Sequence, residues 1–239
     1  MTPRVSVVIP TLGRSPALPE ALGRLRAQEG APPFEVLVVA DAAAPPLDTP
    51  LRAERPGASA ARNLGLREAK ADVVLFLGDD ILASPRLVAV HAEWHAARPE
   101  EHVAVLGHVG WSRRLRVTPF MRWLERGIQT DYGAIDGDRA GWGHFYTTNV
   151  SLKRSFALAA GGFDEDLPFL YEDLDLGRRL ADRGMELIYE RAAEAEHLHP
   201  ATLDGWRERM EAVGRAERAF AAKHPGVEPY FHARLSRAA

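Results

Sequence analysis

Short runs of apolar residues, each ended by a turn-forming residue, recur through the first half of the chain. The clearest is Val73–Leu77 in VVLFLGDD, where five apolar residues precede Gly78 and the adjacent carboxylates of Asp79 and Asp80. An uninterrupted apolar run of this length predicts a strand that is buried on both faces. Runs of the same character predict further strands at Arg4–Pro10, Phe34–Ala40 and Val103–Val109.

Segments whose apolar residues recur at helical spacing lie between these strands. Leucines at every third or fourth position predict an amphipathic helix from about Ser15 to Gln28. Two more helices are expected at Gly57–Lys70 and Ser84–Arg98, and Ala42–Pro56 is expected to be a loop. Strands and helices that alternate in this way form right-handed parallel units. The first half of the chain therefore predicts an α/β fold with a mostly parallel central sheet.

The pattern changes at residue 110. Residues 110–145 are rich in Arg, Trp and Gly and have no clear period, apart from a short helix expected at Pro119–Arg126. An irregular segment of this length inside a compact domain is usually functional, often as a wall or lid over a ligand. We therefore expect it to cover the substrate.

Regular elements return after this segment. Tyr146–Leu152 and Glu186–Tyr189 are expected to be extended, and a helix opened by Glu172 is expected to end at Arg183. The last helix, Leu203–Lys223, is amphipathic. Because its apolar residues share one stripe, we expect it to pack on the domain rather than on a membrane. The stripe consists of Leu203, Trp206, Met210, Val213 and Phe220.

Composition narrows the class of protein. The 239 residues can bury a full core, and no repeat or linker interrupts them, so one domain is expected over residues 1–239. A net charge of −3 gives no attraction to nucleic acid. The absence of cysteine excludes disulfides, thiolate metal sites and cysteine nucleophiles. No apolar run reaches the roughly 18 residues of a membrane span, and the chain starts directly with a strand, so a cytoplasmic location is expected.

Charged residues follow several of the predicted strands. Asp79 and Asp80 stand at the carboxyl end of a buried strand, where open α/β sheets bind ligands. Their oxygens suit Mg²⁺ or Mn²⁺ and, through the metal, a diphosphate, although Asp and Gly also form ordinary turns. Asp41 ends another strand and can accept a hydrogen bond from a base or ribose, or else cap a helix. Arg62 can pair with a nucleotide phosphate or base, or lie at the surface.

Two further pairs of polar residues occur in the second half. Glu172 and Asp173 open a helix, where the dipole favours acidic side chains, and one of them can instead act as a general base. His197 and His199 lie two residues apart, so they share one face of an extended segment. Their imidazoles fit a metal site as well as they fit a structural role. No Ser/His/Asp arrangement, P-loop or dinucleotide GxGxxG is present.

Taken in order, these segments resemble the family 2 glycosyltransferases, which are inverting enzymes with the GT-A fold. The resemblance covers about residues 4–200. It rests on Asp41 and on SVVIPTLGR (Ser6–Arg14), GASAARNLGL (Gly57–Leu66), FLGDD (Phe76–Asp80), TTNVSLKRS (Thr147–Ser155), GGFDEDL (Gly161–Leu167), YEDLDLGRRLADRG (Tyr171–Gly184) and the late HLHP. It implies a three-layer, Rossmann-like GT-A fold with a C-terminal amphipathic helix. Residues 1–109 would bind a nucleotide-sugar, 110–200 the acceptor, and 201–239 would form a helical tail.

The resemblance also implies a role for each matching polar residue. Asp80, with Asp79 beside it, would bind Mn²⁺ or Mg²⁺, and His197, or alternatively His199, would make a late metal contact. Asp173 would deprotonate the acceptor hydroxyl, with Glu172 beside it. The nucleotide-sugar pocket would be formed by Pro10, Thr11, Arg14, Asp41, Arg62 and Asp79.

The implied reaction transfers a sugar from a UDP-, GDP- or dTDP-linked donor to a glycan, a lipid-linked compound or a small molecule, as in cell-surface polysaccharide biosynthesis. A homodimer and peripheral association with the inner face of the membrane stay open. Two other classes also stay open. One is a nucleotidyltransferase that makes nucleotide-sugars on a similar fold, and the other is a non-catalytic module that binds sugar nucleotides or glycans.

Overall fold

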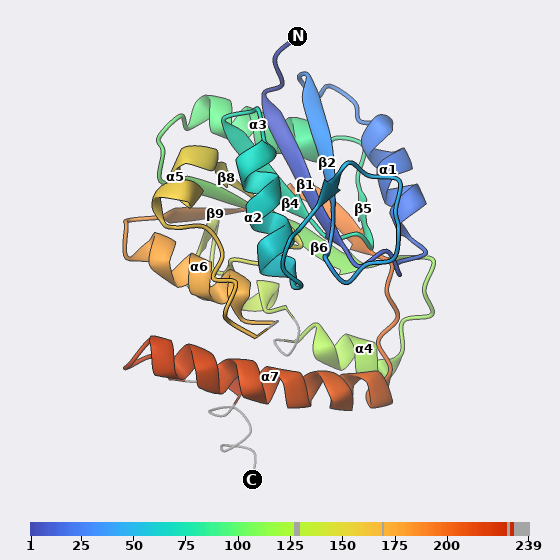
Figure 1. Ribbon diagram of the computed structural model, residues 1–239, viewed down its shortest axis with the longest axis vertical. Helices are drawn as coiled ribbons and strands as arrows, with labels where there is room; N and C mark the ends of the chain where they lie inside the picture. The colour runs from blue at the N-terminus through green and yellow to red at the C-terminus, as the bar shows by residue number, and fades with distance from the viewer. Residues whose placement is uncertain (127–129, 169, 229, 232–239) are drawn as a thin grey trace.

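A nine-stranded sheet forms the centre of the protein in a computed structural model that describes residues 1–126, 130–168, 170–228 and 230–231 (Figure 1). The strands are β1 (Val5–Thr11), β2 (Phe34–Ala40), β3 (Leu51–Arg52), β4 (Val73–Leu77), β5 (Ile81–Ala83), β6 (Val103–Trp111), β7 (Arg139–Ala140), β8 (Asn149–Lys153) and β9 (Glu186–His197). Their order is β3-β2-β1-β4-β8-β6-β9-β5, and β7 pairs with β9. Every residue of β4 is buried, as its apolar run predicted.

The sheet is parallel in its N-terminal half and mixed beyond it. β1 pairs in parallel with β2 and β4, and β2 with β3. β8 runs antiparallel to both β4 and β6, while β9 is parallel to β6 and antiparallel to β5. The sheet therefore has more antiparallel pairs than the pattern predicted. A strand that runs parallel to its neighbour must be reached through a crossover connection, usually a helix. β8 instead follows segment 110–145 and enters the sheet from the opposite end, so it runs antiparallel to β4 and β6.

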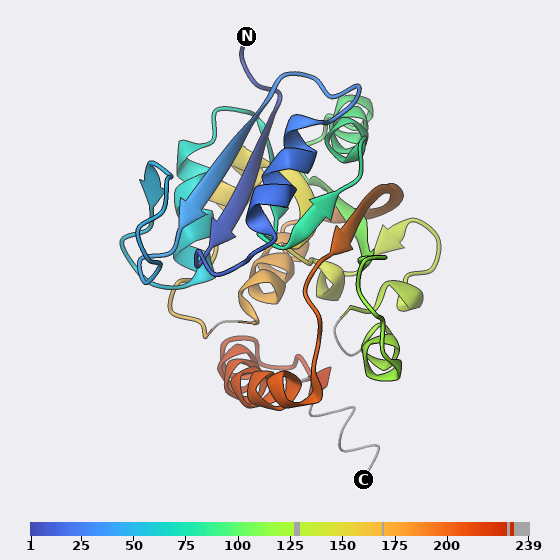
Figure 2. The ribbon, with the colours of Figure 1, turned by 90° about the vertical axis from the view of Figure 1, so that its right-hand side faces the viewer.

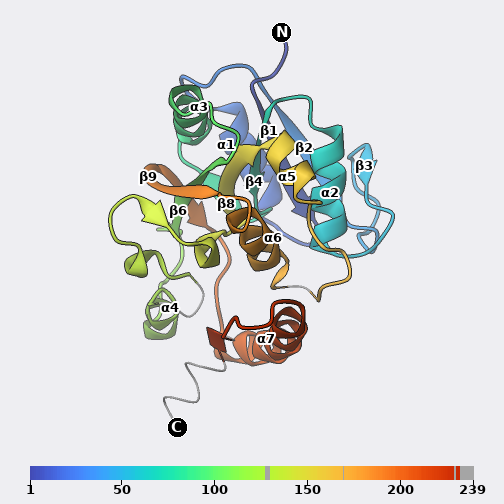
Figure 3. The same ribbon diagram turned by 90° about the vertical axis from the view of Figure 1, so that its left-hand side faces the viewer.

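Helices cover both faces of this sheet and one of its ends (Figure 1). They are α1 (Leu18–Arg26), α2 (Ala58–Glu68), α3 (Leu87–Ala97), α4 (Pro119–Leu124), α5 (Arg154–Ala159), α6 (Glu172–Ala181) and α7 (Leu203–Lys223), with 3-10 turns η1 (Tyr132–Ala134) and η2 (Trp142–His144). Figure 2 shows α1 and α2 on opposite faces of the sheet, and Figure 3 shows α6 on the same side as α2. The three-layer arrangement that the sequence predicted is therefore confirmed.

Several element boundaries differ from the prediction. The first helix begins at Leu18, because Ser15 instead donates a hydrogen bond to the carbonyl of Asp79 at 3.1 Å. The two extended pieces expected after residue 186 form one strand, β9, whose register with β6 shifts at Gly107 and His108. The segment 110–145 contains α4, β7 and both 3-10 turns, so it is more ordered than its composition suggested.

α7 lies across the end of the sheet at which the parallel strands β1, β2 and β4 terminate (Figure 1). Val213 and Phe220 are buried in a small apolar cluster with Tyr171, as the predicted stripe requires. Leu203 is 57% exposed, so the first residue of that stripe does not pack on the domain. In the described part of the chain, no helix combines the length and hydropathy that a membrane crossing requires.

α2 approaches β1 most closely where Gly65 faces Val8. A Cβ atom added at Gly65 would lie 2.3 Å from Val8 Cγ1, well inside the van der Waals limit. Both residues are buried in the core. The glycine is therefore required by the space between helix and strand, and a side chain there would push α2 away from the sheet.

Replacement of Gly65 by alanine should lower the free energy of unfolding by about 1–3 kcal/mol, the usual cost of overpacking a core. Gly23→Ala is the matched control, because Gly23 also lies inside a helix and nothing is within 4 Å of the added methyl group. That change should stabilise the protein by up to about 1 kcal/mol, since alanine has the higher helix propensity. Urea unfolding measures both. Equal effects would show that the approach of α2 to β1 leaves room for a methyl group.

Candidate active site

Asp79 lies at the carboxyl end of β4 and is joined to the end of the neighbouring strand β1. Thr11 donates a hydrogen bond to Asp79 Oδ2 at 2.5 Å, and the backbone N–H of Gly13 donates to Thr11 Oγ1 at 2.9 Å. Burial raises the pKa of Asp79 above its ordinary value, against the effect of the bond from Thr11. The carboxylate of Asp79 therefore fixes the turn that follows β1.

Asp80 faces the histidines at the end of β9. His197 Nε2 lies 3.0 Å from Asp80 Oδ2, and His199 Nδ1 lies 4.0 Å from the same oxygen. Trp111 stacks on the ring of His197 with the centroids 5.4 Å apart. Burial opposes ionisation of Asp80, but the hydrogen bond and charge of His197, with the charge of His199, hold its pKa below the ordinary value.

The chemistry of these side chains fits a divalent cation held by few protein ligands. Asp80 offers a carboxylate oxygen and His197 an imidazole nitrogen, both of which Mn²⁺ accepts. Among the residues that the structure describes, no three His, Cys, Asp or Glu side chains are grouped so as to hold a metal by themselves. Mg²⁺ and Mn²⁺ commonly complete their coordination with water and substrate phosphate.

Asp41 is buried at the end of β2 and accepts hydrogen bonds from backbone groups. Its two carboxylate oxygens accept from the N–H of Ala43 and from the N–H of Gly57, each at 2.7 Å. Gly57 precedes α2 and has a φ of +115°, which favours glycine. Asp41 thus stabilises the start of α2, and its contact with a nucleotide stays a prediction.

Arg62 and Glu172 form a buried ion pair that connects α2 to the start of α6. Arg62 Nη1 donates to Glu172 Oε1 at 2.8 Å, and the two side chains are 11% and 3% exposed. The other Glu172 oxygen accepts the N–H of Leu170 at 2.7 Å, where the backbone has an unusual φ of +98°. Both oxygens of Glu172 therefore already serve the structure.

Asp173 follows Glu172 and lines a cavity. Its Oδ1 accepts the N–H of Leu174 at 2.9 Å. Burial, together with the charge of the neighbouring Glu172, raises the pKa of Asp173 to about 7. Arg62 lowers this pKa, but by less. A carboxylate that titrates near neutral pH beside a cavity can accept a proton from a bound hydroxyl.

The cavity has a volume of about 320 Å³, at the lower end of the range for small-molecule sites. Its walls come from η2, the start of α6, α7 and the segment after α7. Aromatic side chains dominate these walls, while Asp173 and Arg209 are among its polar groups. The aromatic lining consists of Trp142, Tyr146, Tyr171, Trp206, Phe220, Tyr230 and Phe231. Trp142 and Gly143 of segment 110–145 line this cavity, and the expectation that the segment covers a substrate stays a prediction.

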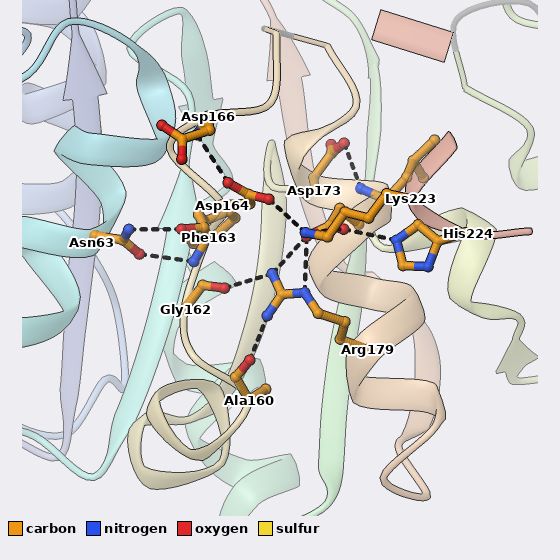
Figure 4. A network of polar contacts seen from close by, with 12 residues as sticks. Asn63, Ala160, Gly162, Phe163, Asp164, Asp166, Asp173, Arg179, Lys223 and His224 are labelled. Atoms are coloured by element: carbon orange, nitrogen blue, oxygen red, sulfur yellow. Dashed lines mark hydrogen bonds and ion pairs between the residues drawn. The ribbon is translucent and has the colours of Figure 1, made fainter. Parts of the chain in front are cut away.

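The end of α7 is attached to α6 by a buried carboxylate. Asp175 is fully buried and contacts Arg179 at 2.7 Å, Lys223 at 2.8 Å and His224 at 2.8 Å. Figure 4 shows these three basic side chains converging, with Lys223 also reaching Asp164 at 2.6 Å. Burial alone would raise the pKa of Asp175, but its bonds to Lys223, His224 and Arg179 hold it below the ordinary value.

Comparison with known proteins decides the family. Residues 6–134, more than half of the chain, match the family described as Glycosyl transferase family 2. The chain belongs to this family. The matched stretch includes the Thr11–Asp79 contact and Arg62, and the resemblance found in the sequence is thereby confirmed.

Relatives of this family 2 chain are longer proteins. Validoxylamine A glucosyltransferase of Streptomyces hygroscopicus subsp. limoneus is 29% identical over 282 residues, covering 95% of this chain and 58% of the relative. The O-antigen biosynthesis protein RfbC of Myxococcus xanthus is 26% identical, covering 98% of this chain and 20% of the relative. The chain therefore spans only part of the length of these relatives.

Solved structures share the fold. TarS 1-349 of S. aureus is similar with a TM-score of 0.66 at 15% identity, over 95% of this chain and 67% of that one. Mannosyltransferase PcManGT of Pyrobaculum calidifontis, solved with GDP-Man and Mn2+, is similar with a TM-score of 0.65 at 21% identity, over 96% and 67%. The GT-A fold expected for a family 2 chain is therefore confirmed.

The structure places the predicted site residues in two groups. Thr11, Asp79, Asp80, His197 and His199 gather where β1, β4 and β9 end, whereas Arg62, Glu172 and Asp173 lie at the start of α6. Pro10 lies within β1, and Arg14 is exposed in the turn beyond it.

The sequence reasoning missed two residues of the site. Asp175 belongs to the same acidic stretch as Asp173, so its position on the helix was the available signal. Arg209 is one arginine among many on an amphipathic helix, and nothing local in the sequence distinguishes it.

We expect Asp175→Asn to lower the free energy of unfolding at pH 7 by about 3–5 kcal/mol, because three basic side chains lose their buried counter-charge. Asp182→Asn on the same helix is the control, since Asp182 is 54% exposed and should change stability by at most about 0.5 kcal/mol. Since the pKa of Asp175 is lowered, its contribution is present above the ordinary Asp pKa of about 3.9 and is lost below it. Thermal unfolding of both variants at pH 7 and pH 3 tests this, and a deficit that persists undiminished at pH 3 would contradict it.

Proposed function

We propose that this chain is an inverting glycosyltransferase that moves a sugar from a nucleotide-diphospho-sugar to an acceptor hydroxyl. One observation carries the proposal: in a chain that belongs to family 2, Asp173, with its pKa raised to about 7, lines a cavity. A carboxylate with a pKa near the working pH is a suitable general base. A binding module would have no need of such a group.

The donor would lie over the carboxyl ends of β1, β2 and β4. Its nucleotide would contact the residues that the resemblance assigns to this pocket, namely Pro10, Thr11, Arg14, Asp41, Arg62 and Asp79. Asp41 and Arg62 are already hydrogen bonded within the protein, so they would fix the shape of the pocket as well as meet the ligand. Solved relatives contain GDP-Man and UDP, which supports a nucleoside diphosphate while leaving the base open.

Asp80 and His197 would hold the divalent cation, with His199 as the next nearest group. Such a cation offsets the negative charge of the departing diphosphate when it is bound. The 3.0 Å contact between Asp80 and His197 holds the carboxylate and the imidazole next to each other at the end of β4. PcManGT, which shares the fold, was solved with Mn2+, and this supports a divalent metal for the present chain by analogy.

Asp173 would accept the proton of the acceptor hydroxyl as its oxygen attacks the anomeric carbon. The new carbon–oxygen bond forms on one face of the sugar while the bond to the diphosphate breaks on the other. The electron pair of that bond leaves with the diphosphate, and the single displacement inverts the anomeric centre. Glu172 is a poor substitute as base, because both of its oxygens accept hydrogen bonds from Arg62 and Leu170.

The acceptor would enter the aromatic cavity next to Asp173. Residues 1–109 would then form the donor half, 110–200 most of the acceptor half, and 201–239 the tail whose helix α7 closes the cavity. The names of the relatives include a validoxylamine A glucosyltransferase and an O-antigen biosynthesis protein, which supports the transfer of a sugar.

Replacement of Asp173 by asparagine separates an enzyme from a binding module. Asparagine caps helices almost as well but cannot accept a proton, so transfer should fall by roughly 10²-fold or more while donor affinity is kept. Transfer by the wild-type protein should also decline as the pH falls below about 7, where Asp173 becomes protonated. A radiolabelled-donor transfer assay measures both, with Asp182→Asn as the control. Normal transfer by Asp173→Asn would remove this residue from the mechanism.

The stability of Asp173→Asn provides a second readout. Because the folded-state pKa is raised, the unfolded chain loses the Asp173 proton first, and stability falls as the pH rises from about 4 to about 7. Asparagine does not ionise, so the variant does not lose stability over this pH range. The variant should therefore melt at a higher temperature than the wild type at pH 8 and at nearly the same temperature at pH 4.

Asp80→Ala should remove the dependence of donor binding on Mn²⁺, because it deletes the carboxylate nearest to His197. Asp72→Ala is the matched control, since Asp72 is exposed at the opposite end of the same strand. Isothermal titration of UDP, GDP and dTDP with and without Mn²⁺ measures the effect. Equal affinity of the wild type in Mn²⁺ and in EDTA would refute the metal assignment.

A further inference from the structure

Arg209 on α7 places a cation at the active site. Its side chain lines the same cavity as Asp173, and its guanidinium lies 5.7 Å from the ring centre of Trp206. Within residues 1–126, 130–168, 170–228 and 230–231, no hydrogen bond or ion pair of Arg209 is found. The guanidinium donors are therefore available to a ligand.

Carboxylates from both groups of site residues, those at the strand ends and those at the start of α6, interact electrostatically with Arg209. The charges of Asp173, Glu172 and Asp80 each favour the cationic form of Arg209, whose side chain is exposed to solvent. An arginine stays charged at any working pH. Arg209 thus lies within electrostatic range of the proposed base and of the proposed metal ligand, on the side of the site that α7 covers.

The charge balance of the site calls for such a cation. The charges of Asp80, Glu172 and Asp173 act on Arg209, while Arg62 is already bonded to Glu172 and His197 to Asp80. A diphosphate brings further negative charge into a partly buried region, where uncompensated charge is costly. A guanidinium matches phosphate oxygens with paired N–H donors, which suits Arg209 to this ligand.

Contacts at both ends of α7 hold Arg209 in this position. Lys223 and His224 fix the last turn to Asp175, and the hydroxyl of Tyr171 donates to Glu217 at 2.7 Å. Near the first turn, Trp206 meets the ring of Phe120 on α4 edge-on, with the centroids 6.4 Å apart. These contacts lie mostly outside residues 6–134, so α7 adds a feature to the matched family region.

We propose that Arg209 binds the diphosphate of the donor and stabilises the charge that this group gains as the sugar leaves. The inference rests on the proposed transferase function and adds a donor contact supplied by the C-terminal helix. The electron pair of the breaking sugar–oxygen bond goes to the diphosphate, where the N–H groups of Arg209 donate hydrogen bonds. Arg209 would in this way act on the leaving group, while Asp173 takes up the proton of the acceptor hydroxyl.

Nucleotide binding by Arg209→Ala tests the inference. We first titrate the wild type with UDP, GDP and dTDP in the presence of Mn²⁺, and then use the tightest nucleotide and its monophosphate. Loss of a charged, paired hydrogen bond should weaken diphosphate binding about 10- to 100-fold and monophosphate binding much less. The rate constant kcat for transfer should fall as well, and Arg209→Lys should recover part of both.

Arg207→Ala is the matched control, because Arg207 lies on the same helix and its side chain is 77% exposed. It should change neither affinity nor kcat, and thermal unfolding should show that all variants are folded. Unchanged diphosphate affinity in Arg209→Ala, or a defect confined to the KM of the acceptor, would overturn the inference in favour of an acceptor contact. If the wild type binds no nucleoside diphosphate at all, the proposed function itself is wrong, and the role of Arg209 falls with it.

Discussion

The buried ion pair between Arg62 and Glu172 is the contact on which the geometry of the site depends. It joins α2, which lies between β3 and β4 in the chain, to α6, which precedes β9. Breaking a buried pair leaves an unpaired charge in a region of low polarity, so the two helices are held in one relative position. Because Glu172 is fixed at the first residue of α6, its neighbour Asp173 is directed toward the cavity.

The same arrangement explains the electrostatics of the site. Glu172 has a buried partner, whereas the donors found for Asp173 among the described residues are backbone groups, so burial and the adjacent charge raise the pKa of Asp173. Asp80 has the opposite environment, since His197 donates to it and lowers its pKa. The two carboxylates therefore differ in how readily they ionise, which fits the separate roles proposed for them.

α7 completes the site from outside the stretch that matches the family. Its apolar stripe packs on Tyr171, and its last turn binds the buried Asp175 through Lys223 and His224. The helix therefore serves as a wall of the cavity as well as a cover for the end of the sheet. Under the proposed function, differences in this part of the chain would change the acceptor, because much of the lining of the cavity belongs to α7 and the segment after it.

The local pattern of the sequence determined the parallel half of the fold and the position of the main carboxylates. The apolar run Val73–Leu77 became a buried strand with Asp79 and Asp80 at its end, and the helices covered the faces that their periodicity indicated. These features follow from local periodicity, which a single sequence displays. The antiparallel entry of β8 did not follow, because pairing with β4 and β6 depends on segments far apart in the chain.

The partners of the charged side chains were decided only by the tertiary structure. The sequence offered Asp79 and Glu172 as site residues, but their oxygens accept hydrogen bonds from Thr11 and Arg62, which lie 68 and 110 residues away along the chain, separations that no local pattern encodes. Arg209 reached the site only because α7 folds back across the sheet. The residue types at the site were therefore readable from the sequence. Which of them support the structure, and which are proposed to act in the reaction, depended on distances in the folded chain.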